Sequence, residues 1–413
     1  MKQNITKPLK ILVGMSGGVD SSVAAALLVK QGFDVTGGFI KNWSDSKDFW
    51  TGECAWRGER RDALRVAAQL DIPLLTFDFE KEYRHRVLDR MFAEYQKGLT
   101  PNPDVLCNEE IKFGLFFEAA MRQGFDGVAT GHYARVRHDG DGQAHLLKGL
   151  DPNKDQSYFL HRLSQKVLQK TLFPIGHLHK TRVRQLATQM KLPTAKKPDS
   201  QGICFVGKLD FHEFLRKRIK PTPGDIVTPE GLTVGRHDGL DAYTIGQRHG
   251  FFVKAPLRAG FHHRQGYGGQ VGGQAWYVAK KDFKKNQLII VPSREHPLLY
   301  QKEAVIKDVN WTGGRLRRAG YRLQVTADRL QGIEVAIRYR QKPEKARLVI
   351  ARSESANDAA ISDSDGRLLR RKTPRNDKVS YRLLFDHPVW ALAPGQSAVL
   401  YRGAECLGGG FIG

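Results

Sequence analysis

The chain has 413 residues, and its 66 lysines and arginines stand against 43 aspartates and glutamates, which gives a formal net charge of +23. A surplus of this size favours a polyanionic partner. Nucleic acid is expected before a membrane, because no amphipathic basic helix and no apolar run of transmembrane length stands out. The length predicts two or three domains, and the short polar start argues against a signal peptide, so we expect a cytoplasmic protein.

The strongest local pattern is an apolar strand at residues 11–13, followed by a glycine-containing loop and a helix rich in alanine and leucine. Glycines let the backbone approach an anion, and the amides at the start of the helix attract phosphate. The loop lacks the ending of a Walker A motif and the spacing of a dinucleotide fingerprint. Its residues Ser16-Gly17-Gly18-Val19-Asp20-Ser21 resemble the pyrophosphatase loop of enzymes that split pyrophosphate from ATP. The alternative is a glycine turn capped by Asp20 or Ser21.

From residue 9 to about 129, short apolar stretches alternate with longer stretches of helical periodicity. This alternation predicts an α/β fold with a doubly wound parallel sheet, in which ligands bind at the carboxyl ends of the strands. Ile40 ends the second strand and Gly131 follows the last one, so both are candidates to complete a pocket beside the glycine loop. The expected strands cover 34–40, 74–79 and 127–130, and the expected helices cover 60–70, 83–95 and 109–123.

Cys107 lies in a proline-containing segment, residues 98–109, between two expected helices. Asn108 is expected to cap the helix that starts near Glu109, which would place Cys107 just outside a helix N-terminus, where the pKa of a thiol is lowered. Asp104 lies a short reach away and is a candidate general base. On this stretch alone, a buried structural cysteine fits the sequence equally well.

Cys204 lies in a second proline-bounded loop, residues 196–207, with lysines before it and an apolar stretch after it. The lysines would stabilise a thiolate, and a cysteine within a short buried strand is an equal alternative. The four cysteines are far apart and form no Cys-x-x-Cys pair, which argues against a zinc site. Cys54 and Cys406 are interpreted as structural.

The pattern changes near residue 211, where the first domain, residues 1–210, is expected to end. Short strands and turns predict a small β-rich central module at 211–285, and alternating strands predict a β-barrel at 286–413. Within the central module, residues 244–248 are interpreted as a functional or linking loop. The glycine-rich stretch 260–273 is of low complexity and is expected to be a loop.

Basic and polar segments outside the first sheet are candidates for nucleic-acid contact. Arg338 and Tyr339 stand together at an expected strand end, a combination suited to stacking on a base and binding phosphate. Residues 154–156, Lys-Asp-Gln, lie in a polar loop. The basic runs 315–322 and 367–375 are either solvated charged faces or phosphate contacts.

Taken together, these segments resemble the bacterial tRNA-specific 2-thiouridylase family nearly from end to end. The resemblance implies an ATP-pyrophosphatase domain, a central module and a C-terminal tRNA-binding β-barrel. It also implies an enzyme, a tRNA-uridine 2-sulfurtransferase, that exchanges oxygen for sulfur at carbon 2 of the wobble uridine. The segments that carry it are Gly14 to Ser21, Asn102-Pro103-Asp104 before Cys107, Gly131-His132-Tyr133, Lys154-Asp155-Gln156, Asp199-Ser200-Gln201-Gly202-Ile203-Cys204, Arg338-Tyr339-Arg340-Gln341 and Pro394-Gly395-Gln396-Ser397-Ala398-Val399.

The resemblance also assigns roles to residues. Cys204 would carry a persulfide from a sulfur donor, a cysteine desulfurase or a sulfur-relay protein. Cys107 would attack it to release sulfide, or form a disulfide with Cys204, and Asp104 would be the acid/base. ATP, accompanied by Mg²⁺ and with no tightly bound metal, would bind Gly14, Met15, Ser16, Gly17, Gly18, Val19, Asp20, Ser21, Ile40 and Gly131. The tRNA would bind Asn102, Pro103, Asp104, Lys154, Asp155, Gln156, Arg338 and Tyr339.

The chain departs from the family pattern at a few places. Ile40 stands where the family often has Met, Gln201 replaces a frequent Thr, and 260–273 and 351–377 do not match. Two other functions remain open at this point. A synthetase that joins ammonia or an amine to an adenylated substrate would not need the two cysteines, and a catalytically silent RNA-binding protein would not consume ATP.

Overall fold

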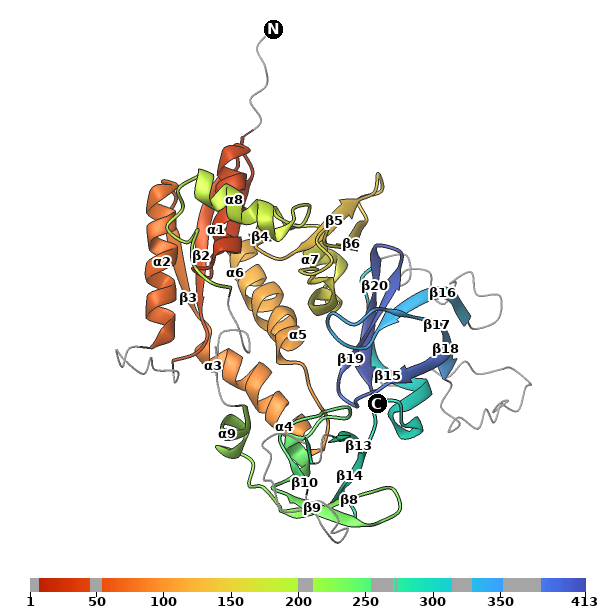
Figure 1. The fold of residues 1–413 in the computed structure, drawn as a ribbon. Helices are drawn as coiled ribbons and strands as arrows, with labels where there is room; N and C mark the ends of the chain where they lie inside the picture. Colours follow the sequence, from red (N-terminus) through yellow and green to blue (C-terminus); the bar gives the residue numbers. More distant parts are fainter. Residues whose placement is uncertain are drawn as a thin grey trace, which may run out of the picture.

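The computed structural model describes residues 7–44, 54–199, 211–253, 270–271, 274–313, 329–351 and 380–413. Several sequence predictions therefore lie outside the described residues, namely those on Cys204, on the basic runs 315–322 and 367–375, and on most of 260–273 and 351–377. Figure 1 shows three regions: a sheet with helices at the N-terminal end, a β-rich module, and a C-terminal barrel. The division at residues 210 and 285 stays a prediction.

The first region is built on a five-stranded sheet with the strand order β3-β2-β1-β4-β7. All neighbouring strands in it are parallel, which confirms the predicted fold class. The strands are β1 (Lys10–Gly14), β2 (Asp34–Lys41), β3 (Leu74–Asp78), β4 (Gly127–Thr130) and β7 (Thr171–Leu172). The order reverses beside β1, so its carboxyl end is the expected ligand site of such a sheet.

Helices cover both faces of this sheet because β1 is apolar on both sides. Ile11 and Val13 pack into one buried cluster, and Leu12 between them packs into another. Successive residues of a strand point to opposite faces, so an unbroken apolar run requires cover on each. The first cluster includes residues of α1 (Val19–Lys30), α2 (Ala55–Gln69) and α8 (Lys180–Gln189). The second includes residues of the helical segments between residues 80 and 122.

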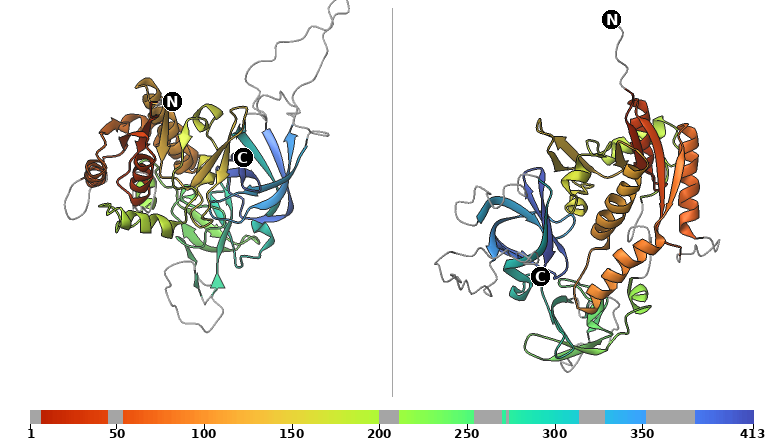
Figure 2. Two further views of the ribbon diagram at one scale, coloured as in Figure 1. Left: turned by 90° about the horizontal axis from the view of Figure 1, so that it is seen from above. Right: turned by 180° about the vertical axis from the view of Figure 1, so that it is seen from behind.

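Those helical segments form two longer rods. The first consists of α3 (Glu80–Tyr83), a π-helical stretch (Arg84–Asp89) and α4 (Arg90–Gln96). The second consists of α5 (Pro103–Cys107), a π-helical stretch (Asn108–Leu115) and α6 (Phe116–Arg122). The right view of Figure 2 shows the second rod between the N-terminal sheet and the barrel, and the first rod running from the sheet toward the β-rich module.

The predicted start of the second rod is wrong. The helix begins at Pro103 and not near Glu109, because the Asn102 side chain accepts hydrogen bonds from the amides of Asp104 and Val105. Asparagine at the N-cap followed by proline at the first helical position is a strong start signal. Cys107 therefore lies inside the helix and not outside its N-terminus.

The C-terminal region is a barrel, as predicted. The eight-stranded sheet has the order β15-β18-β17-β16-β19-β20-β6-β5, and pairing of β15 with β20 closes six of its strands. The six are β15 (Tyr300–Trp311), β16 (Arg329–Ala336), β17 (Glu344–Ala351), β18 (Ser380–Trp390), β19 (Ser397–Arg402) and β20 (Glu405–Ile412). The hairpin of β5 (Ala134–His138) and β6 (Ala144–Lys148) extends this sheet from the first region, because β6 pairs with β20.

The β-rich module begins after α9 (Phe211–Arg216) with a five-stranded sheet ordered β10-β9-β8-β14-β13. Its strands are β8 (Gly224–Val227), β9 (Thr233–His237), β10 (Phe252–Val253), β13 (Tyr277–Asp282) and β14 (Gln287–Val291), and β11 (Gln270–Val271) pairs with β12 (Gln274–Ala275). The remaining short helices are α7 (Gln165–Leu168) and the 3₁₀ turns Ser157–Leu160, Leu240–Ala242 and Pro297–Leu299. Within the described part of the chain, no helix is long and apolar enough to span a bilayer.

Candidate active site

The glycine loop joins β1 to α1 at the carboxyl end of the sheet. Gly17 has φ +73°, and a Cβ on it would lie 2.2 Å from the carbonyl oxygen of Glu59, so only glycine fits there. Gly18 is the N-cap of α1, and no side chain caps the helix. Neither Asp20 nor Ser21 caps the first-turn amides of α1, although the Ser21 side chain is bonded within the turn. The uncapped first-turn amides can bind an anion.

The hydroxyl groups of Ser16 and Ser21 line the same loop. Their Oγ atoms are 3.2 Å apart, and the amide of Ser16 donates to Oγ of Ser21 at 3.2 Å. The Ser21 hydroxyl donates to the carbonyl oxygen of Gly18 at 3.1 Å. The Ser21 side chain is thus bonded within the loop and leaves the helix amides uncapped.

Gly131 and Ile40 lie where the sheet topology predicts. A Cβ on Gly131 would lie 2.6 Å from the amide nitrogen of Ser21, so the chain after β4 passes directly against the loop. Ile40 is 7 % exposed near the end of β2, and the amide of Met15 donates to the carbonyl oxygen of Gly38 at 2.9 Å. The structure brings these residues together at one sheet edge, and their contact with a nucleotide stays a prediction.

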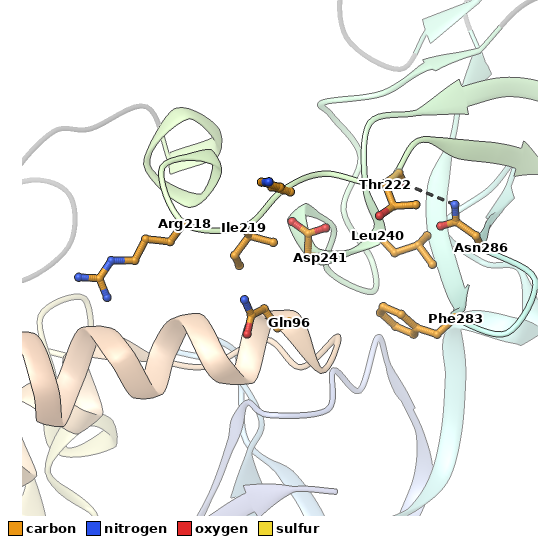
Figure 3. A pocket seen from close by; sticks show the side chains of 9 residues that line it. Gln96, Arg218, Ile219, Thr222, Leu240, Asp241, Phe283 and Asn286 are labelled. Atoms are coloured by element: carbon orange, nitrogen blue, oxygen red, sulfur yellow. Dashed lines mark hydrogen bonds between the residues drawn. The ribbon is translucent and has the colours of Figure 1, made fainter.

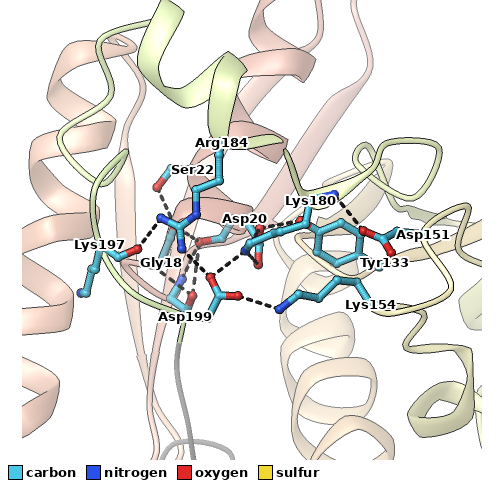
Figure 4. A network of polar contacts seen from close by, with 12 residues as sticks. Gly18, Asp20, Ser22, Tyr133, Asp151, Lys154, Lys180, Arg184, Lys197 and Asp199 are labelled. Carbon is cyan, nitrogen blue, oxygen red and sulfur yellow. Dashed lines mark hydrogen bonds and ion pairs between the residues drawn. The ribbon is translucent and has the colours of Figure 1, made fainter. Parts of the chain in front are cut away.

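A network of charged side chains lies beside the loop (Figure 4). Lys180, at the start of α8, places Nζ 2.7 Å from Oδ1 of Asp20 and 2.8 Å from Oδ1 of Asp199. Asp20 also accepts a hydrogen bond of 2.8 Å from the Tyr133 hydroxyl. Burial opposes ionisation of Asp199, but hydrogen bonds from Lys154 and Lys180 outweigh it and hold the pKa of this carboxyl well below its ordinary value.

The network ties residues 197–199 to the loop. Lys197 donates from Nζ to the carbonyl oxygen of Gly17 at 3.0 Å and pairs with Asp62 at 2.7 Å. Asp199 receives Nζ of Lys154 at 2.7 Å and Nη2 of Arg184 at 2.6 Å. The chain that leads toward Cys204 is therefore held against the glycine loop, although Cys204 itself lies outside the described residues.

Sequence reasoning missed Lys180 and Arg184. These two residues lie one helical turn apart in α8, so they face the same way. Two cations at this spacing are common on solvated helices, and the sequence signal alone does not single them out. Their importance comes from the tertiary contacts with Asp20 and Asp199.

Cys107 is fully buried at the end of α5, within the core cluster that lies beneath the sheet. Asp104 lies one turn earlier and is half-buried, so the two side chains share a helix face. The structure thus brings Asp104 and Cys107 together in one short helix. Cys107 does not have the position just outside a helix N-terminus that the sequence predicted.

The predicted tRNA residues of the polar loop have internal contacts. Asp155 accepts hydrogen bonds from the amides of Gly149 and Ser157, and burial raises the pKa of its carboxyl. Gln156 accepts from the amide of Tyr133 through Oε1 at 2.9 Å. With Lys154 bonded to Asp199, this loop helps to build the glycine-loop site.

Arg338 and Tyr339 also face inward. Nη2 of Arg338 donates to the carbonyl oxygens of Ile245 at 2.5 Å and Ala391 at 3.0 Å, and the guanidinium lies 5.2 Å from the ring centre of Trp390. The ring of Tyr339 lies 4.4 Å from that of Phe159. The 244–248 loop thus contacts the barrel through Ile245, and its role as a functional or linking loop stays a prediction.

The other cysteines fit structural roles. Cys406 is fully buried, and burial raises the pKa of its thiol to about 12, which disfavours the reactive thiolate. Cys54 is half-buried at the N-cap position of α2. Among the residues that the structure describes, no three His, Cys, Asp or Glu side chains gather to hold a metal ion. Asp20, in the loop, is already bonded to Lys180 and Tyr133, so its carboxylate does not offer a cation site by itself.

A separate cavity of about 600 Å³ lies between α4 and the β-rich module (Figure 3). Arg218 and Lys220 line it together with Gln96, and Phe283 forms part of its wall. The glycine loop contributes no residue to its lining. None of the residues predicted to bind ATP lines this cavity.

Family comparisons cover most of the chain. A family model described as the tRNA methyl transferase HUP domain matches residues 9–208, one described as the tRNA methyl transferase PRC-barrel domain matches 212–292, and one described as an aminomethyltransferase β-barrel domain matches 372–412. A solved structure of a 4-thiouridine synthetase–RNA complex with bound ATP is 16% identical, covers 50% of each chain and has a TM-score of 0.30, a likeness too low to bear on function.

Curated relatives match over nearly the whole length. The tRNA-specific 2-thiouridylase MnmA of Burkholderia pseudomallei (strain 1106a) is 45% identical over 406 residues, which are 98% of this chain and 93% of that protein. The protein of the same name from Acidovorax sp. (strain JS42) is 43% identical over 411 residues, which are 98% of each chain. By this identity and coverage, the chain belongs to the tRNA-specific 2-thiouridylase family.

Proposed function

We propose that this protein is an ATP-dependent tRNA-uridine 2-sulfurtransferase. It adenylates the 2-oxygen of the wobble uridine in tRNA, releases pyrophosphate, and then replaces the adenylated oxygen with sulfur. Membership of the 2-thiouridylase family supports the substrate and the overall reaction. The formal net charge of +23 suits a polyanionic substrate.

The observation that carries the proposal is the attachment of residues 197–199 to the glycine loop. Lys197 bonds to Gly17, and Lys180 joins Asp20 to Asp199. Cys204 follows Asp199 by five residues, and a fully extended chain of that length spans roughly 18 Å. A nucleotide loop and a sulfur-carrying cysteine would thus be kept within reach of one another.

The loop would bind the ATP phosphates through its backbone. The first-turn amides of α1 carry no side-chain cap, and the positive end of the helix dipole favours anions there. Lys180 and Lys197 add positive charge beside the loop, which would stabilise the charge that develops as pyrophosphate leaves. Mg²⁺, expected to accompany the phosphates, would add to the same charge stabilisation.

Adenylation solves the problem of a poor leaving group. The uracil 2-oxygen attacks the α-phosphorus, the bond to pyrophosphate breaks, and carbon 2 then carries AMP. Sulfide that attacks carbon 2 expels AMP, which keeps the original uridine oxygen, and the base becomes 2-thiouridine. Asp104, half-buried at the start of α5, would exchange protons with the base as charge moves.

Sulfide would come from a persulfide on Cys204, supplied by a sulfur donor. The Cys107 thiolate attacks the inner sulfur of this persulfide, the S–S bond breaks, and hydrosulfide leaves while a Cys107–Cys204 disulfide forms. External thiols then reduce that disulfide. Because Cys107 is fully buried in the described conformation, the segments around it must rearrange before this step.

The tRNA-binding residues carried over from the family fall into two groups in this proposal. One group contacts the target uridine, and the other holds the rest of the tRNA. Asn102, Pro103 and Asp104 lie half-buried at the N-terminal end of α5, where a uridine flipped from its stack would meet them. Lys154 and Arg338 would hold the tRNA only if they exchange their present contacts with Asp199 and the 244–246 turn.

Mass spectrometry of tRNA nucleosides tests the proposal. The purified protein is incubated with unmodified tRNA, ATP, Mg²⁺ and a persulfide source, and the tRNA is digested. We expect 2-thiouridine that depends on ATP, together with AMP and pyrophosphate in equal amounts. Absence of thiolated nucleoside with a functional sulfur source would contradict the function, and ADP in place of AMP would contradict the adenylation step.

A further inference from the structure

Thr100 is hydrogen-bonded to the C-terminal barrel and to the β-rich central module, and it lies two residues before the N-cap of α5. Its amide donates to the carbonyl oxygen of Pro394 at 2.7 Å, and its carbonyl oxygen accepts from Nε2 of Gln396 at 2.9 Å. Its Oγ1 lies 3.4 Å from Oγ1 of Thr244. Thr100 is only 7 % exposed, so both the barrel and the central module enclose it.

The chain around Thr100 leaves no free space on either side. Gly395 of the barrel has φ +90°, and a Cβ on it would lie 2.7 Å from the amide nitrogen of Thr100. Gly98 has φ +76°, and a Cβ on it would lie 2.1 Å from Cζ of Phe283 in the central module. Residues 98–100 are thus held between two regions that are distant in sequence.

Arg338 connects the two turns that hold Thr100. One Nη2 atom bonds to Ile245 in the turn that contains Thr244, and to Ala391 in the turn that leads to Gly395. A Cβ on Gly246 would lie 2.6 Å from Cβ of Ala391, so the two turns are in direct contact. The two turns that hold Thr100 are therefore in contact with each other, and a shift of one is expected to move the other.

The link from Thr100 to the helix is short and stiff. Pro101 and Pro103 have a fixed φ and restrict the residues before them, so this stretch has few soft torsions. Between them, the Asn102 side chain caps the amides of Asp104 and Val105. A shift of Thr100 is therefore passed to the N-terminus of α5.

We propose that Thr100 is a positioning residue, through which the barrel and the central module set the place of Asp104 and Cys107. The inference rests on the proposed function for the roles of those two residues. Beyond the proposed function, it says that the barrel and the central module act on the sulfur-transfer step and not only on tRNA binding. No side-chain atom of Thr100 needs to touch the substrate.

Gly395→Ala is the direct test, because the new methyl group must push against the backbone of Thr100. We expect kcat for tRNA thiolation to fall by at least about tenfold, since small misplacements of catalytic groups are costly, while the Kd for tRNA stays within about twofold. The matched control is Gly403→Ala, in the β19–β20 turn. Gly403 also has a positive φ, +59°, but nothing lies within 4 Å of its added Cβ.

Gln396→Leu provides a second variant in case Gly395→Ala folds poorly. It removes the donor to the Thr100 carbonyl at nearly constant size and introduces no backbone strain. We expect kcat to fall by several-fold, again with little change in the Kd for tRNA. In both variants, we expect faster hydrogen exchange than in the wild type for a peptide that covers residues 104–107, and wild-type exchange in Gly403→Ala.

The outcomes separate this inference from the proposed function. If the wild type makes no 2-thiouridine, the proposed function fails, and the exchange measurement still decides whether Gly395 and Gln396 hold α5. If the wild type is active, unchanged kcat and exchange in both variants would overturn the inference. A loss of tRNA affinity equal to the loss of activity would also overturn it, because these residues would then act in binding.

Discussion

Nζ of Lys180 lies 2.7 Å from Oδ1 of Asp20, and the same ammonium reaches Asp199 on its other side. A cation from α8 thus neutralises a carboxylate of the glycine loop and fixes residues just before the Cys204 segment. In the proposed reaction, phosphate oxygens would compete with both carboxylates for this ammonium. In that proposal, Lys180 would connect nucleotide binding to the residues just before Cys204.

Removal of this charge should impair the use of ATP. For Lys180→Met we expect kcat/KM for ATP to fall by roughly 100-fold, the lower end of the loss seen when one group that stabilises transition-state charge is removed. Lys180→Arg should retain more activity than Lys180→Met because it keeps the cation. Steady-state pyrophosphate release in the presence of tRNA measures the effect.

Lys166→Met is the matched control for that experiment. Lys166 lies exposed on α7, so its loss changes the net charge equally. If Lys166→Met and Lys180→Met lower kcat/KM to the same degree, the effect would be one of overall charge, and the local role of Lys180 would be wrong.

The ion pairs of Asp199 should make its contribution to stability depend on pH. The folded-state pKa is depressed below the unfolded value of about 3.9, so the contribution is complete above that value and is lost as pH falls through the folded pKa. Asp199→Asn should cost about 1 kcal/mol at pH 7, because the pairs are partly exposed and screened. Urea unfolding at pH 7 and at pH 3 should show a smaller difference at pH 3, whereas a constant difference would exclude this cause.

The Asn102 cap should account for a measurable part of the stability of α5. Asn102→Ala should lower the free energy of unfolding by about 1 kcal/mol, because the amides of Asp104 and Val105 lose their acceptor. Asn102→Asp keeps a capping oxygen and should retain the stability. Urea titrations of the two variants would refute the capping role if both lost stability equally.

Substitution of either cysteine proposed to handle sulfur should abolish activity, whereas substitution of a structural cysteine should not. Cys107→Ser and Cys204→Ser should abolish thiolation and keep the affinity for tRNA, because neither thiol is needed for the phosphate contacts that dominate binding. Cys54→Ser should keep full activity, since serine is a good N-cap residue for α2. Nucleoside analysis and filter binding measure both quantities, and normal thiolation by Cys204→Ser would remove its persulfide role.

The glycine loop and the parallel sheet could be predicted because each follows from residues close together in the sequence. The glycine loop follows from a strand, three glycines and a helix within a short stretch, and the parallel sheet follows from the alternation of elements. The start of α5 was misplaced because Asn102 and Asn108 both satisfy the rule for a cap. Pro103, directly after Asn102, decides between them.

Tertiary contacts explain what the sequence did not reveal. Asp20, Lys180 and Asp199 are separated along the chain, and Lys180 contacts both carboxylates only in the folded protein. Arg338 has the residue type and neighbours of a nucleic-acid contact, yet its guanidinium joins two turns of the protein. The hairpin of β5 and β6 lies in the part of the sequence predicted to be the first domain, but β6 pairs with β20, the last strand of the barrel.

Oxygen-isotope tracing tests the central claim most directly. A tRNA that carries ¹⁸O at carbon 2 of the wobble uridine is converted with ATP and a persulfide source, and the released AMP is analysed by mass spectrometry. Adenylation of the uridine oxygen predicts AMP that carries one ¹⁸O atom for each 2-thiouridine formed. Unlabelled AMP, with the isotope recovered in water, would contradict it.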